Sequence, residues 1–417
     1  MSQHAPQLDD ASHSRKTPNW NMLRPGLVAG CGLVLLGGGV VAWRHQASER
    51  LYQAGLNSIS AGDVEVLERA VSSQPVNSPR SRLLMAAIDL RNNKPASAMR
   101  KLEVAAHHPE TALWAQFLAG EALYRMQEYH AAITTLRAAL EQDPENVDGR
   151  RWLAAAAFDL GANADAVEQL TKIIQLNPTD SRAYRALGLI YFEAEEYAKA
   201  INPLQSSLSQ SREQPDTEQI LVELATSYLK VHRYHDALES LQGSPPSPEL
   251  DSLKAESLYA LGRVDEARQL IEHVLEIGPT PRALILSGMM LQDDGRAADA
   301  VQQLKRAVAL QPEDLETRAR LTQAYAQSGD ADAARRELTE TERITRIRQE
   351  IHEFTLQAAN QAQSADVRYE LGLRYQSLGL IPPARKWFRA ALALDPTHAA
   401  ARNALSKLSV IPASGRN

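Results

Sequence analysis

The stretch that decides the fold is Leu113–Pro144, which reads LWAQFLAGEALYRMQEYHAAITTLRAALEQDP. Its composition, rich in Ala and Leu, is that of two helices joined by a turn. Gly120 and Ala132 are small residues placed where the two helices would touch, and Pro144 would end the pair because proline cannot continue a helix. The stretch therefore predicts a helix–turn–helix unit.

The same pattern recurs along the chain with a period near 34 residues. The small position is occupied by Ala98, Ala132, Ala166, Ala200, Ala237, Ala267, Ala300 and Ala334, and then by Ala384 after an insertion. The first four of these are each 34 residues apart, and Pro75, Pro109, Pro144 and Pro178 keep nearly the same interval. A fixed period of this length is the mark of a repeat architecture, in which neighbouring units bury a continuous core together.

Unit by unit, the chain resembles the tetratricopeptide repeat family, whose members repeat a 34-residue helix–turn–helix. Within Leu113–Pro144 the motif residues are Gly120, Leu123, Tyr129, Ala132, Leu136, Ala139 and Pro144, and the following units offer Gly161 with Ala166, Gly188 with Ala200, Gly288 with Ala300, and Gly372 with Ala384. The resemblance implies an all-α, right-handed superhelix, an α-solenoid, with helices as its only secondary structure.

The predicted organisation has four parts: residues 1–24 as a disordered tail, 25–43 as a membrane anchor, 48–398 as about nine or ten repeat units, and 399–417 as a capping helix and tail. A break is expected near 242–250, and a lengthened helix near 335–363, where the spacing grows. Pro203 should kink or shorten its helix. Ile344, Ile347, Ile351 and Phe354 form an apolar stripe expected to pack on neighbouring helices.

Composition excludes several functions. The net charge of −6 and the absence of a basic stripe interleaved with aromatic residues argue against a nucleic-acid partner. A single cysteine, Cys31, permits neither an intramolecular disulfide nor a cysteine-based metal site.

Residues Pro25–Trp43 carry no charge. About 19 helical residues reach about 28 Å, close to a hydrocarbon core of about 30 Å. Two alternatives compete with an uncleaved anchor. The first is a lipoprotein, since Val28-Ala29-Gly30-Cys31 is similar to a lipoprotein processing site, but most of the apolar run follows the cysteine. The second is a signal peptide cleaved after Val40-Val41-Ala42, but the polar region before its apolar run would be unusually long. An uncleaved anchor fits the length and the flanks best.

The flanking charges favour an inside N-terminus by a single residue, so the repeat array is expected on the extracytoplasmic side, most simply of a bacterial inner membrane. Gly26 and Gly30 lie one helical turn apart and offer a surface for self-association through the anchor, although glycine is common in membrane helices.

No catalytic constellation is present in the sequence. His107-His108 is isolated, His352-Glu353 lacks the second histidine of a zinc motif, and neither a phosphate-binding loop nor a nucleophile elbow occurs. We therefore expect no enzymatic activity, no cofactor and no metal site.

In the family, the first helix of each unit lines a concave groove that binds partners. Carried onto units three to five, this implies a partner-binding surface of Trp114, Phe117, Tyr124, Arg125, Arg151, Trp152, Phe158, Arg182, Arg185 and Phe192. Aromatic and arginine side chains are the usual interface anchors, and Arg182 and Arg185 are expected to face solvent. Trp152 and Phe158 have the alternative of lying in the core between units.

Family members that clamp a C-terminal carboxylate use Lys and Asn at set groove positions, where this chain has Glu121, Ala155 and Leu189. The function expected from these features is a membrane-anchored scaffold or adaptor for protein or peptide partners, without catalysis. The alternative is an assembly or quality-control factor, acting like a chaperone on envelope or secreted proteins.

Overall fold

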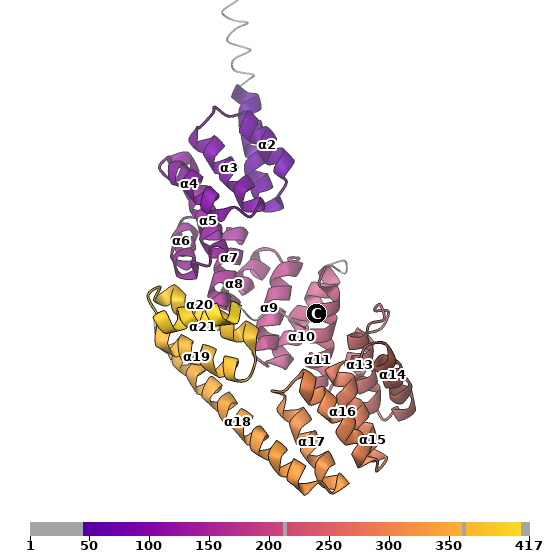
Figure 1. Cartoon of the computed structure of the whole chain (residues 1–417). Helices are drawn as coiled ribbons and strands as arrows, with labels where there is room; N and C mark the ends of the chain where they lie inside the picture. The colour runs from indigo at the N-terminus through magenta and orange to yellow at the C-terminus, as the bar shows by residue number, and fades with distance from the viewer. Residues whose placement is uncertain (1–44, 212–214, 361–363, 410–417) are drawn as a thin grey trace, which may run out of the picture.

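A computed structural model describes residues 45–211, 215–360 and 364–409, and all of their regular secondary structure is helical (Figure 1). After the helical residues 45–61 come α2 (Val64–Ser72), α3 (Pro79–Arg91), α4 (Pro95–Ala106), α5 (Pro109–Arg125), α6 (Tyr129–Gln142), α7 (Val147–Asp159), α8 (Asn163–Leu176), α9 (Ser181–Glu193), α10 (Tyr197–Gln210), α11 (Thr217–Lys230), α12 (Tyr234–Ser240), α13 (Pro248–Ala260), α14 (Val264–Ile277), α15 (Pro281–Asp293), α16 (Ala297–Leu310), α17 (Leu315–Ser328), α18 (Ala331–Asn360), α19 (Ala365–Ser377), α20 (Ile381–Leu394) and α21 (Ala399–Ser409). The prediction of an all-α helical array is confirmed.

Consecutive helices pair into antiparallel units, and the same close contact recurs inside them. A Cβ built on Gly120 of α5 would lie 2.4 Å from the Leu136 side chain of α6, and one on Gly288 of α15 would lie 2.7 Å from Leu304 of α16. Only a residue without a side chain allows the second helix to approach this closely. The repeated alanine near the start of each second helix is also packed closely, since Ala166 of α8 is fully buried. We number the units from residues 45–72 (unit one) to α19–α20 (unit ten).

The ends of the first helices are set locally. Asn146, Asp180 and Asp314 accept a hydrogen bond from the backbone three residues on, and so cap α7, α9 and α17. Other first helices, such as α5 and α15, begin with proline, which is already shaped for a first helical turn. Each cap begins a new first helix after the turn that ends the preceding unit, so one sequence period gives one helix pair.

Of the two effects expected of Pro203, a kink or a shortened helix, the shortening does not occur. Pro203 lies inside α10, yet α10 has 14 residues, the same length as α6 and α8. Pro203 is buried against the neighbouring helices, and Leu204 beside it is fully buried. Packing of this segment therefore outweighs the loss of one backbone hydrogen bond.

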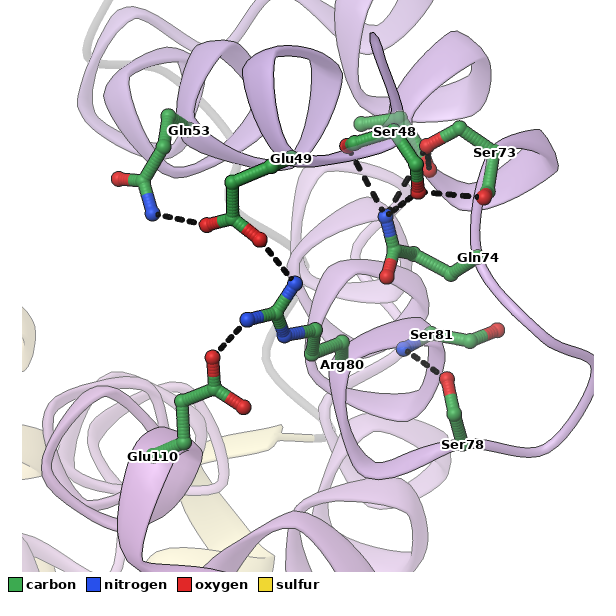
Figure 2. A network of polar contacts seen from close by, with 10 residues as sticks. Ser48, Glu49, Gln53, Ser73, Gln74, Ser78, Arg80, Ser81 and Glu110 are labelled. Atoms are coloured by element: carbon green, nitrogen blue, oxygen red, sulfur yellow. Dashed lines mark hydrogen bonds and ion pairs between the residues drawn. The ribbon is translucent and has the colours of Figure 1, made fainter. Parts of the chain in front are cut away.

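The first helical segment, 45–61, is tied into the array by polar contacts (Figure 2). Arg80 of α3 donates to Glu49 at 2.6 Å, makes a second ion pair with Glu110 of α5, and lies over the Tyr52 ring at 4.3 Å. Gln74 donates to the hydroxyl of Ser48 at 3.0 Å. One arginine thus connects helices of units one, two and three, so the start of the described chain is fixed to the repeats.

The longest helix, α18, has 30 residues, a length of about 45 Å. It leaves α17 and carries the chain back, so that α20 contacts α6 (Figure 1). A single apolar cluster accordingly contains Tyr129 of α6 and Leu153 of α7 together with Leu371 and Trp387 from the C-terminal helices. The stripe on α18 packs on neighbours as expected, with Ile344 1% exposed and Ile351 and Phe354 against this cluster.

The expected anchor at 25–43, Gly26 and Gly30 within it, the tail at 1–24 and the last residues from 410 lie outside the described residues. Among the helices of the described ranges, none combines the length and apolar character needed to cross a membrane.

Candidate functional site

The residues expected to bind partners lie on α5, α7 and α9, and the structure separates them into core and surface. Phe117 is only 6% exposed, and its ring fills the space beside Gly149, where an added Cβ would lie 2.4 Å from the ring. Phe117 is therefore core between units three and four. Trp114, Tyr124, Trp152, Phe158 and Phe192 are half-buried, so each keeps a face accessible from outside the repeat core.

The arginines of this surface mostly serve to join units. Arg151 of α7 pairs with Asp180, the cap of α9, at 2.7 Å, and Arg185 of α9 pairs with Asp216, which precedes α11, at 2.7 Å. Arg80 and Glu110 make the same connection earlier in the chain. The partners are 29, 31 and 30 residues apart, so a basic residue on one first helix reaches an acid at the start of the next.

The expectation that Arg185 faces solvent is wrong. Its guanidinium also pairs with Glu223 at 2.6 Å, and the side chains of Arg185 and Glu223 are 15% and 2% exposed. This carboxylate on α11 would be buried without compensation if Arg185 were absent. Arg182, by contrast, is exposed and makes no ion pair with a described residue, as the sequence led us to expect.

The aromatic residues cluster where units three and four meet. The rings of Tyr124 and Trp152 have centroids 5.2 Å apart, those of Tyr124 and Tyr129 5.6 Å apart, and Arg125 lies 5.3 Å from the centre of the Trp152 ring. Arg125 also pairs with Glu121 at 2.8 Å. Burial, together with the nearby carboxylate of Asp159, raises the pKa of Tyr124, so its hydroxyl stays protonated.

The C-terminal unit covers one end of this cluster. Trp387 of α20 lies against Gly161 in the turn between α7 and α8, where an added Cβ would come within 2.5 Å of the indole. The ammonium of Lys386 lies 3.6 Å from the centre of the Phe158 ring. Lys386 of the chain itself thus covers the Phe158 ring. Trp152 packs against the apolar cluster that contains Trp387 of α20.

The sequence analysis missed this docking. Lys386 and Trp387 follow Ala384 at the ordinary spacing of a second helix, and that spacing predicts packing within unit ten alone. The long α18 was the one signal that the C-terminal unit is displaced from the regular stack. No group of three or more His, Cys, Asp or Glu side chains within the described ranges is placed to hold a metal ion.

Comparison with known proteins agrees with this geometry. One family model, described as tetratricopeptide repeat, matches residues 117–181, 156–215 and 222–280, and a second model with the same description matches 291–346. Together these matches cover half of the chain. The chain belongs to the tetratricopeptide repeat family.

Curated relatives of this tetratricopeptide repeat protein share short segments with it. The Hsp70-Hsp90 organizing protein of Triticum aestivum is 28% identical over 102 residues, which are 24% of this chain and 17% of the relative. The tetratricopeptide repeat and J domain-containing co-chaperone DNJ1 of Fusarium oxysporum f. sp. lycopersici is 24% identical over 196 residues, 45% of this chain and 38% of the relative. The chain thus spans well under half the length of these relatives.

Among solved structures, a tetratricopeptide repeat protein from Parabacteroides merdae is similar with a TM-score of 0.40 and 16% identity, over 59% of this chain and 98% of that one. The chain in the crystal structure of the APC/C hetero-tetramer Cut9-Hcn1 is similar with a TM-score of 0.39 and 14% identity, over 89% of this chain and 74% of that one.

Proposed function

We propose that this protein is a membrane-anchored, non-enzymatic scaffold that binds protein partners through the first helices of units three to five. The uncharged Pro25–Trp43 segment would hold the chain in the membrane, with the array, right-handed by family resemblance, on the extracytoplasmic side of a bacterial inner membrane. The packed segment 45–61 begins directly after the anchor, so membrane and repeats would be joined closely.

The observation that carries this proposal is the row of aromatic side chains that remain half-buried on successive first helices. Trp114 on α5, Trp152 on α7 and Phe192 on α9 each leave part of a large apolar surface outside the repeat core. Such side chains supply much of the binding energy of protein interfaces. Arg182, on the same helix as Phe192, adds an exposed positive charge that pairs with no acid among the described residues.

Site-specific crosslinking tests this proposal. A photoreactive residue at Arg182 should crosslink a defined protein in cells, whereas the same residue at Lys172, which is exposed on the second helix α8, should not. In the protein without the photoreactive residue, Arg182→Glu should abolish copurification of the same partner, because reversing an exposed charge adds repulsion at the interface without disturbing the fold. Equal crosslinking from both positions would contradict binding through the first helices.

An assembly or quality-control role is the second candidate, since two similar relatives are named as a co-chaperone and a chaperone-organizing protein. The same crosslinks distinguish the two functions. One partner recovered in fixed stoichiometry supports the scaffold, and a changing set of incompletely folded clients supports the assembly factor.

A further inference from the structure

Where α20 docks against units three and four, the two parts of the chain enclose a small, half-open cavity of about 220 Å³. Its walls are Tyr129, Asp159, Pro382, Arg385, Lys386 and Arg389. Tyr129 is the first residue of α6 and Asp159 is the last residue of α7, whereas the other four residues come from α20. The cavity therefore exists only while the C-terminal unit is docked.

The charge of this cavity is unbalanced. Three of its lining residues are cations, and Asp159 is its single carboxylate. Within the described part of the chain, Arg385, Lys386 and Arg389 make no ion pair and no side-chain hydrogen bond, and the Nε of Arg389 is buried without a partner. Arg151 and Arg185 differ, because each is held between two carboxylates of the chain itself.

The surroundings make these charges effective. Burial lowers the pKa of Lys386, against the opposing effect of Glu193 and Asp159 nearby, and burial also raises the pKa of Asp159. Both shifts mark a region from which water is partly excluded, where Coulomb interactions are stronger than at an open surface. An anion entering beside Arg385 and Arg389 would be attracted by both guanidinium groups.

We propose that this cavity binds one oxyanion group, a carboxylate or a phosphate, and that its occupancy holds the C-terminal unit against units three and four. The volume lies below the roughly 300 Å³ at which pockets for whole small molecules begin, so it suits a single charged group. Because the walls come from two parts of the chain, binding and docking must strengthen each other by the same factor. The cavity adjoins the first-helix surface at α7, but none of its lining residues is among Trp114, Trp152, Arg182 and Phe192, on which the proposed function rests.

Binding to the full-length protein in detergent tests the proposal. Sodium phosphate and a fluorescent oligoglutamate peptide are titrated at an ionic strength kept constant with sodium chloride. We expect Arg385→Gln with Arg389→Gln to weaken binding about tenfold or more, the range for losing a hydrogen bond to a charged group. Asp159→Asn should strengthen binding, since it removes the repulsion from the carboxylate that lines the cavity. Lys305→Gln with Arg306→Gln, an exposed pair on α16, is the matched control and should change nothing.

The two probes identify the source of the oxyanion. Tight phosphate binding indicates a free anion, and a clear preference for oligoglutamate indicates an acidic segment of a protein. In either case the bound probe should slow hydrogen exchange in α20 and in the turn at Gly161. The proposal is overturned if neither probe binds, if the control variant weakens binding equally, or if exchange in α20 is unchanged by saturating probe.

Discussion

Charge reversal at Arg185 should destabilise the array, whereas the same change three residues earlier should not. Arg185→Glu would place a third carboxylate beside Asp216 and the buried Glu223, whose side chain is 2% exposed. Removing one partner of a buried pair costs about 3–5 kcal/mol, because the remaining charge is left uncompensated. Arg182 is exposed without an ion pair to a described residue, and such a surface substitution stays within about 0.5 kcal/mol.

Urea unfolding of the full-length variants, followed by helical circular dichroism, measures this difference. Hydrogen exchange should show that Arg185→Glu loosens α9 and α11 first, because units of a repeat array contact only their neighbours. Arg185→Met combined with Glu223→Met should recover much of the loss, since a buried ion pair is often replaceable by apolar groups of similar size. Equal stability of the Arg182→Glu and Arg185→Glu variants would refute the assignment of Arg185 as a contact between units.

Further changes test other contacts. Ala166→Trp should overpack the fully buried contact of α7 with α8 and cost about 1–3 kcal/mol, with protection lost mainly in adjoining units. Trp387→Ala should cost about 3–5 kcal/mol in the docking of the C-terminal unit, seen as faster exchange in α19–α21 and around Gly161 but not in α13–α16. Burial raises the pKa of Asp159, so the folded protein binds a proton there more readily than the unfolded chain. Asp159→Asn should therefore be more stable than the wild type at neutral pH. Urea unfolding at a series of pH values should show this difference shrinking as the pH falls through the raised pKa. Cys31→Ser should leave membrane attachment unchanged; release of the variant from membranes would indicate a lipoprotein instead.

The candidate surface could be predicted only in part. The helical positions of Trp114, Trp152 and Phe192 follow from the repeat pattern, and so does the exposure of Arg182. The acidic partners of Arg151 and Arg185 were also visible in the sequence, because Asp180 and Asp216 follow them by 29 and 31 residues. It was missed because a residue's position within one unit does not show which side chain of the next unit it meets.

What the sequence by itself determined is the repeating unit. The contact of Gly120 with Leu136 spans one turn between two helices, and caps such as Asp180 act within three residues. Interactions this short in sequence are specified by local spacing, and they recur because the spacing recurs. The tertiary structure alone decided that Trp387 meets Gly161 and that Arg385 and Arg389 share a cavity with Asp159. Those contacts join residues more than two hundred positions apart, and they depend on the small rotations added at every unit and on the length of α18.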